Sequence, residues 1–223
     1  MTRKTIIIAV IIVLGGLLAF YGFFSLGSGS VVYISDEAVL ARDRGEHLLN
    51  RRRHTTDRTQ RAELLTKAIN EFNSALKLKS EFPVAYNMLG HCYMERGQWE
   101  DALKNLNKAL ELRPDYPAAF FNRGKIYQRM SLGKRDQAYL DRAIADYHKS
   151  LLSDLSVNFR GDLYKSLADA YHQKGDLGKS IEQLKTYLKR SPKANDATLI
   201  RRKIRGLTLM HKGKAPPLSA PLD

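Results

Sequence analysis

Residues of the same kind recur at intervals of 34 positions through much of this 223-residue chain. A fixed period of about 20 to 50 residues is typical of solenoids, in which each unit packs mainly on its neighbours. The period therefore predicts a solenoid of repeated units. The matching pairs are Pro83 and Pro117, Tyr86 and Phe120, Gly90 and Gly124, Tyr93 and Tyr127, Ala68 and Ala102, Ala75 and Ala109, and Leu78 and Leu112.

One period, residues 83–116, has the residue types of two closely packed helices. Gly90 and Ala102 are small, which lets the helices cross closely. Gly97 tolerates a positive φ and ends the first helix, and Pro114 stops the second. Larger residues fill the space around the crossing: Tyr86, Tyr93, Trp99 and Leu106. Leu89 and Ala109 also stand at the spacing of the repeat. With this pattern the segment resembles a near-consensus tetratricopeptide (TPR) repeat, a helix-turn-helix unit, and the resemblance implies an α-solenoid.

The next unit, residues 117–160, carries an insertion. Its Gly124 and Ala143 are 19 positions apart, whereas the equivalent Gly90 and Ala102 are 12 apart. The seven additional residues lie within 130–141. They predict either about two extra helical turns or a longer loop.

The remaining parts of the array are predicted by the same comparison. Residues 161–194 form a further TPR unit, and residues 36–82 form a degenerate TPR-like one with an insertion near 46–60. Residues 195–210 are expected to be a capping helix with a basic outer face, as a solenoid end requires. Residues 211–223 follow as a mobile tail. The predicted fold is an all-α TPR solenoid of about four repeats plus this capping helix.

Residues 5–24 contain no charged side chain. About twenty residues at about 1.5 Å per residue span the apolar core of a bilayer. We therefore expect residues 1–26 to form one transmembrane helix, retained as a signal anchor, with residues 27–35 as a linker. A signal peptide cleaved near residues 27–30 is the alternative.

The charges around this segment predict its orientation. Arg3 and Lys4 precede the apolar run, and the next basic residue is Arg42. By the positive-inside rule, the N-terminus stays in the cytoplasm and the repeat domain is exported. The expected location is the inner (cytoplasmic) membrane as a single-pass protein, with the TPR domain in the periplasm if the chain is bacterial.

No pattern of catalytic residues is present. The sequence lacks a Walker loop, a nucleophile elbow and a glycine-rich phosphate loop. Its one cysteine, Cys92, excludes an internal disulfide and is expected to be a buried thiol. The six histidines show no metal-ligand spacing. We expect no enzymatic activity, no cofactor and no metal site.

The TPR resemblance implies a concave groove lined by the first helix of each repeat. Phe121, Met88 and Met94 would give it apolar surface suited to an adaptable peptide site. The alternative is that the C-terminal helix folds back over some of these residues. The predicted groove residues are Asn87, Met88, His91, Met94, Phe121, Asn122, Lys125, Gln128, Arg129, Lys165, Asp169 and His172.

The resemblance also allows one specific activity to be tested. TPR domains that bind chaperones hold a C-terminal carboxylate with a clamp of lysine, asparagine and arginine. Only Asn122 matches that pattern here, and Asp162 stands where a lysine is needed. An aspartate at that position would repel the carboxylate, so the clamp is rejected.

The formal net charge is +14. Basic clusters lie at residues 51–61 and 201–205. They are either solvated faces or sites for anionic lipid or an acidic protein surface. Nucleic acid is disfavoured because aromatic residues do not interleave with the basic ones.

Together these features predict a membrane-anchored scaffold or adaptor that mediates protein–protein interaction. Its expected role is that of an assembly factor for a membrane or envelope complex. The alternative is a permanent structural subunit of a large membrane complex. The two insertions favour that alternative somewhat, because segments added to a repeat are often contact surfaces.

Overall fold

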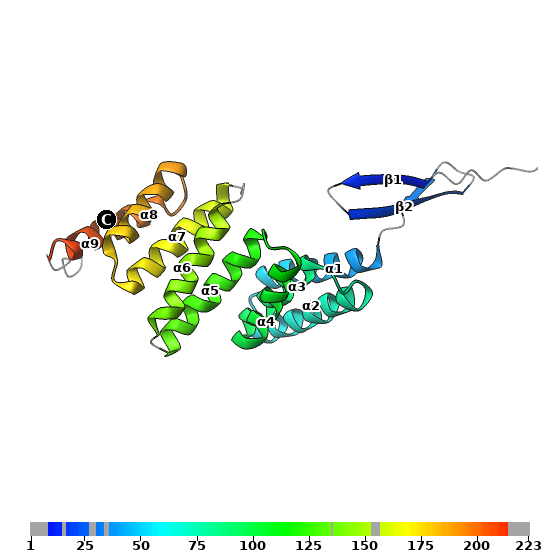
Figure 1. Cartoon of the computed structure of the whole chain (residues 1–223), viewed down its shortest axis with the longest axis horizontal. Helices are drawn as coiled ribbons and strands as arrows, with labels where there is room; N and C mark the ends of the chain where they lie inside the picture. The colour runs from blue at the N-terminus through cyan, green and yellow to red at the C-terminus, as the bar shows by residue number, and fades with distance from the viewer. Residues whose placement is uncertain are drawn as a thin grey trace, which may run out of the picture. The chain divides into compact units, whose positions relative to one another are not determined.

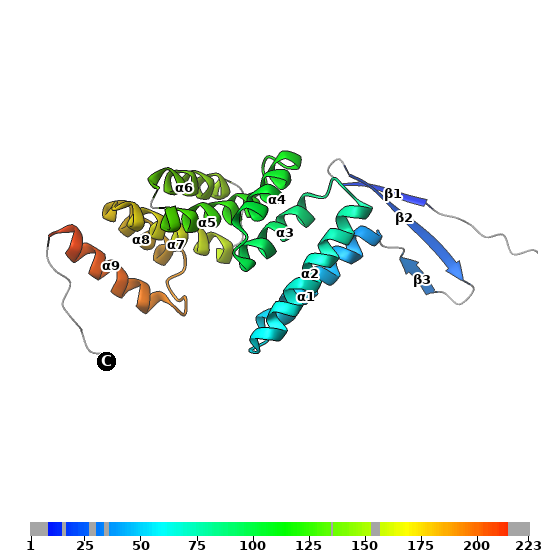
Figure 2. The same cartoon turned by 90° about the horizontal axis from the view of Figure 1, so that it is seen from below.

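The computed structural model describes the backbone of residues 9–14, 17–26, 30–33, 36–134, 136–152 and 157–213. Side chains are described for residues 36–133, 136–152 and 159–213. The chain divides into two compact units, Met1–Ser80 and Glu81–Asp223. Figure 1 labels their helices and strands β1 and β2, and Figure 2 also labels β3.

The first unit begins with an antiparallel sheet in the order β1-β2-β3, formed by Ala9–Leu14, Leu17–Leu26 and Ser30–Tyr33. Strand β1 pairs with β2 through Ala9 and Gly22, and β2 pairs with β3 through Phe23 and Tyr33.

The transmembrane helix expected in this region is not found, because the described residues between 5 and 24 form strands. The residue types explain the difference. Isoleucine and valine favour strands, and a Gly-Gly pair such as Gly15–Gly16 in the sequence is typical of a tight hairpin. Within the described parts of the chain, no helix is both long and apolar enough to span a membrane. Residues 5–8, most of the predicted linker and residues 214–223 of the predicted tail lie outside the described residues.

Helices α1 (Glu37–Arg53) and α2 (Arg58–Leu78) follow and lie side by side (Figure 2). Each begins at an aspartate whose carboxylate accepts a hydrogen bond from a backbone N–H. Asp36 accepts from Ala38 at 2.9 Å and Asp57 from Gln60 at 2.6 Å. A Cβ on Gly45 would lie 2.6 Å from the Phe72 ring, so glycine permits the close contact of the two helices.

The insertion expected near residues 46–60 is mostly helix. Helix α2 begins ten residues before Ala68, whereas the equivalent α4 begins three residues before Ala102. Three arginines, Arg51, Arg52 and Arg53, occupy the last turn of α1. The negative end of the helix dipole favours cations there, which is a structural reason for this basic cluster.

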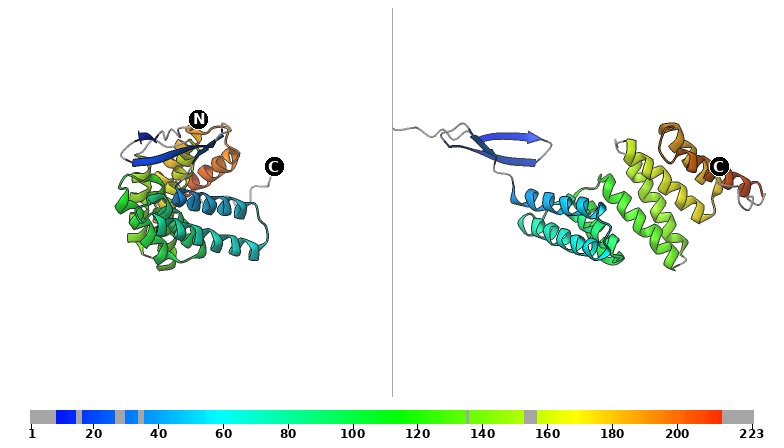
Figure 3. Two further views of the ribbon diagram at one scale, coloured as in Figure 1. Left: turned by 90° about the vertical axis from the view of Figure 1, so that its right-hand side faces the viewer. Right: turned by 180° about the vertical axis from the view of Figure 1, so that it is seen from behind.

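The second unit contains seven helices among its described residues. Figures 1 and 3 show them in chain order, and α3 to α9 each contact the next. They are α3 (Pro83–Arg96), α4 (Trp99–Leu112), α5 (Pro117–Lys134), α6 (Gln137–Leu151), α7 (Val157–Lys174), α8 (Leu177–Arg190) and α9 (Ala197–His211).

The close helix crossing predicted from the small residues is present in the repeats. A Cβ on Gly124 would lie 2.7 Å from the Tyr147 ring. In the last repeat Ala168 takes the glycine position, and the Ser180 hydroxyl donates to its carbonyl oxygen at 2.8 Å. Gly97 and Gly175 follow α3 and α7 with φ values of 76° and 86°, in the left-handed region that glycine favours. The all-α solenoid predicted from the period is therefore the observed fold of this unit.

The insertion in the second repeat is helical. Of the two predicted alternatives, extra helical turns or a longer loop, the structure has the extra turns. Helix α5 continues ten residues past Gly124, whereas α3 continues six past Gly90. Helix α6 begins six residues before Ala143. Within the inserted stretch Met130 and Leu140 are only 8% and 3% exposed. The added residues therefore extend the core.

The last helix is fastened at Asp196, which immediately precedes it. The Tyr187 hydroxyl donates to Oδ1 of Asp196 at 2.5 Å, and the Lys165 ammonium donates to Oδ2 at 3.1 Å. Both hydrogen bonds lower the pKa of Asp196, and the one from Tyr187 has the larger effect.

Acid is expected to weaken this attachment. A lowered folded-state pKa means that Asp196 stabilises the fold above its unfolded pKa of about 4 and loses this contribution as pH falls through the folded value. Measured by urea unfolding, the free energy of unfolding of the native chain should therefore exceed that of an Asp196→Asn variant at neutral pH. In acid the two free energies should become equal. An equal difference at both pH values would contradict this assignment.

Candidate functional site

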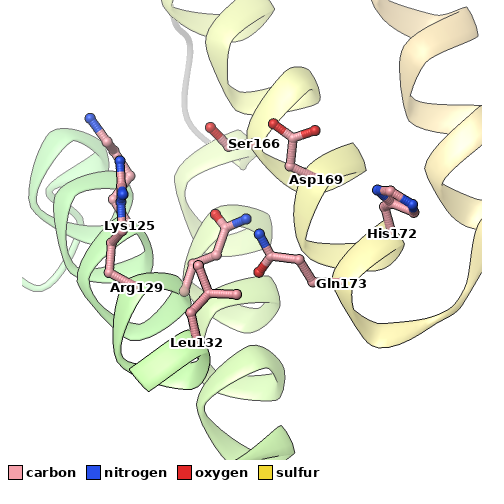
Figure 4. Close-up of a pocket in the computed structure, with 8 residues that line it drawn as sticks. Lys125, Arg129, Leu132, Ser166, Asp169, His172 and Gln173 are labelled. Atoms are coloured by element: carbon pink, nitrogen blue, oxygen red, sulfur yellow. The ribbon is translucent and has the colours of Figure 1, made fainter. Parts of the chain in front are cut away.

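The first helices α3, α5 and α7 border two adjoining hollows. One, of about 320 Å³, lies between α5 and α7 (Figure 4). The other, of about 450 Å³, lies between α5 and the end of α3. Lys125 and Arg129 of α5 border both, which makes them the centre of the site. The first hollow is lined by Lys125, Gln128, Arg129, Leu132, Ser166, Asp169, His172 and Gln173, and the second by Met94, Glu95, Arg96, Gly97, Trp99, Lys125 and Arg129.

Two predicted groove residues are buried beneath this surface. Asn87 is 2% exposed and Asn122 is 9% exposed. The Asn122 amide donates to Asn87 Oδ1 at 3.0 Å, which joins α3 to α5. Buried amides need such partners. Neither residue lines one of the two hollows, and their amides contact each other.

Phe121, expected as open apolar surface, is half-buried and packs on other aromatic rings. Its ring centroid lies 5.1 Å from that of Phe159 and 5.9 Å from that of Tyr147. The Lys125 ammonium lies 5.6 Å from the same ring centroid. Such a contact is a cation–π interaction, and it holds Lys125 in place.

The three residues predicted on α3 besides Asn87 differ in exposure. Met94 borders the second hollow but is only 8% exposed. Met88 and His91 are half-buried and line neither of the two hollows described above. Trp99, which sequence reasoning placed only in the core, is half-buried and borders the second hollow.

On α7 the charged groove residues are paired within the chain. The Lys165 ammonium bonds Asp196 at 3.1 Å and Asp162 at 3.2 Å. Asp169 forms an ion pair with Lys203 of α9. Both charges are therefore neutralised within the chain, although Asp169 still borders the first hollow. The C-terminal helix α9 packs mainly on α8, so these pairs do not bear out the alternative in which it folds back over Phe121, Met88 and Met94. His172 remains exposed at the first hollow.

On α5, unlike on α7, the charged groove residues are not paired within the described part of the chain. Arg129 is exposed and Lys125 half-buried, and neither has a carboxylate partner within the described part of the chain. Gln128, which lies between them in sequence, accepts a hydrogen bond from the Tyr147 hydroxyl at 2.8 Å, and this bond holds the Gln128 side chain in place. The two cations are therefore available to an anionic group from outside.

Sequence reasoning missed Leu132, which borders the first hollow and is 59% exposed. It lies on the turn that the insertion adds to α5. The length of the insertion could have indicated it only if the extra residues were already known to be helical.

The remaining candidate chemistry is limited. Cys92 is fully buried, as predicted. Among the residues whose side chains are described, no group of three or more His, Cys, Asp or Glu could hold a metal ion. The groove thus offers charge, hydrogen bonds and apolar contact.

Comparison with known proteins agrees with the fold. Models for the TPR repeat and the tetratricopeptide repeat match residues 90–131 and 161–193. No curated protein matches the chain in sequence.

Three solved structures are similar in fold. MamA is 21% identical over 71% of this chain and 80% of its own, with a TM-score of 0.54. MamA from Desulfovibrio magneticus RS-1, from residue 41 to its end, is 16% identical over 81% of this chain and 98% of its own, with a TM-score of 0.52. A thermophilic TPR protein of Thermus thermophilus is 18% identical over 77% of this chain and 99% of its own, with a TM-score of 0.54.

The chain therefore contains TPR repeats. Repeats of this class form extended concave surfaces that bind other proteins, which implies a protein–protein interaction scaffold. Proteins built from them are in general scaffolds and not enzymes.

Proposed function

We propose that this chain of TPR repeats binds a segment of a partner protein along α3, α5 and α7, and so brings that partner to a membrane complex during its assembly. The observation that carries the proposal is the pair of adjoining hollows that share Lys125 and Arg129. Their volumes of about 320 and 450 Å³ fall in the range of about 300 to 1,000 Å³ typical of pockets for small molecules, so each is large enough to take a side chain.

The residue types around the hollows support binding of a protein segment. Trp99 and Arg129 are of the kinds that most often dominate binding energy at protein interfaces. The groups around them are already held by contacts within the fold, as Gln128 is by Tyr147. Pre-ordered side chains lose less conformational freedom on binding.

The cleanest test is a photo-crosslinking amino acid placed in the full-length chain in cells. His172 and Gln173 are exposed at the first hollow. Lys104 and Lys185 are exposed on the second helices α4 and α8 and serve as matched controls. We expect one defined adduct from the groove positions and none of that size from the controls. The same adducts from all four positions, or adducts from the controls only, would contradict groove binding.

The membrane location is a separate part of the proposal. We propose that residues 5–24 hold the chain at the inner membrane, with the N-terminus in the cytoplasm and the repeats on the opposite side. This requires the stretch to become a helix in the bilayer in place of strands β1 and β2, because an open sheet cannot span the apolar core. Support comes from the absence of charge over this stretch and from the two basic residues that precede it.

This location can be tested with alkaline carbonate, which removes peripheral proteins from membranes. The full chain is expected to stay with the membrane pellet, whereas a chain beginning at Asp36 is expected in the supernatant. A reporter fused after Asp223 should be active only in the exported compartment. Release of the full chain by carbonate, or a reporter active in the cytoplasm, would contradict the proposal.

A further inference from the structure

We propose that the bound segment carries an acidic side chain beside a large apolar one. Its carboxylate is held between Lys125 and Arg129, and its apolar neighbour enters the hollow next to Trp99. This inference rests on the proposed function and names the kind of peptide that the groove takes.

The first step is the balance of charge along the groove. On α7, Lys165 and Asp169 are neutralised by Asp196 and Lys203. On α5, Lys125 and Arg129 have no carboxylate partner among the described residues. Unpaired positive charge is therefore concentrated at the boundary of the two hollows, where an anionic group is favoured.

The second step is geometry. Lys125 and Arg129 are four positions apart on α5, so they lie on one face of the helix with Cβ atoms about 5 to 6 Å apart. Figure 4 shows both on the same helix, across the hollow from Ser166 and Asp169 of α7. A carboxylate between them can accept hydrogen bonds from both, and bonds between two charged groups are among the strongest in proteins.

The third step is the apolar neighbour. Trp99 and Met94 border the second hollow together with the same two cations. Gly97 lies between them in sequence, and a Cβ added there would come 3.8 Å from the Trp99 ring. Trp99 is half-buried and lines this hollow, so its ring can contact a bound apolar residue. Glu95 also lines this hollow, which disfavours an acidic group there and directs it toward α5.

The carboxylate is assigned to a side chain and not to a peptide C-terminus. The clamp that holds a terminal carboxylate in chaperone-binding TPR domains is absent, since Asp162 stands at one of its lysine positions. Asp162 is instead paired with Lys165 at 3.2 Å.

The experiment uses random linear peptides displayed on phage, selected on the full-length chain. Because each displayed peptide continues into the coat protein, it has no free C-terminus. We expect the selected peptides to share an aspartate or glutamate next to a large apolar residue. Selection on a Lys125→Glu/Arg129→Glu variant should replace that acid with lysine or arginine.

A synthetic peptide chosen from the native selection provides the quantitative test. It should bind the double variant at least about tenfold more weakly, and its affinity for the native chain should fall as salt is added. The control is Lys104→Glu/Lys185→Glu, which changes the net charge equally on the second helices and should bind as the native chain does. Unchanged far-UV circular dichroism of both variants shows that they fold.

The outcomes separate this inference from the proposed function. If selected peptides block crosslinking from His172 but show no preference for an acid, the acidic specificity is refuted and groove binding stands. Equal affinity of the acidic peptide for the native chain and the α5 variant also refutes the specificity. If no selected peptide blocks crosslinking from His172, groove binding of peptides is refuted as well.

Discussion

Replacement of Asp146 by alanine is expected to lower the free energy of unfolding by about 3 to 5 kcal/mol, because it leaves a largely buried arginine without its partner. The side chains of Asp146 and Arg123 are 5% and 18% exposed. Arg123 donates to both carboxylate oxygens, at 2.7 and 2.9 Å. It also donates to Asn107 at 2.7 Å, so one guanidinium joins α4, α5 and α6.

The measurement is urea unfolding followed by tryptophan fluorescence. Trp99 is the one tryptophan of the chain and packs in the core formed by α3 to α6, so its signal reports on the second unit. Asp141→Ala is the matched control, because its pair with Lys174 is exposed on both sides and such pairs contribute about 1 kcal/mol or less. Equal losses in the two variants would show that burial does not strengthen the Arg123–Asp146 pair.

The second large effect is expected at Gly90. A Cβ there would lie 2.5 Å from Leu106 Cγ and 3.3 Å from the Ala102 carbonyl oxygen. Leu106 is fully buried and the carbonyl belongs to the backbone of α4, so neither can move without disturbing the helix pair. We expect Gly90→Ala to lower the free energy of unfolding by about 1 to 3 kcal/mol, the range found when a packed core is overfilled.

A glycine in open space provides the control. Gly206 lies inside α9, and a Cβ added there meets nothing within 4 Å. Gly206→Ala is expected to stabilise the fold by about 0.5 to 1 kcal/mol, because alanine loses less backbone freedom than glycine in a helix. If Gly90→Ala also stabilised the protein, helix propensity would outweigh the close contact, and the packing argument would be wrong.

The candidate site could be predicted only in part. The TPR resemblance implies which face of each first helix lines the groove, and Lys125, Gln128 and Arg129, which it indicates, border the hollow between α5 and α7. It could not indicate which charges are already paired. Asp169 pairs with Lys203, and Lys165 with Asp196, across helices that meet only in the folded chain.

The N-terminal stretch shows a different limit. A run of isoleucine, valine and leucine is compatible with a helix or with strands, because both bury apolar side chains. Length favoured a helix, whereas the described residues pair as β1 and β2. Apolar composition alone does not distinguish the two.

The sequence by itself determined the repeat, the close helix crossings and the turn glycines, because each depends on the size or backbone freedom of single residues such as Gly90 and Gly97. Only the tertiary structure decided the form of the seven-residue insertion. As a loop it would have exposed Met130 and Leu140, which are buried in the observed fold. Divided between α5 and α6 as added helix, it keeps both side chains in the core and places Leu132 at the border of the first hollow.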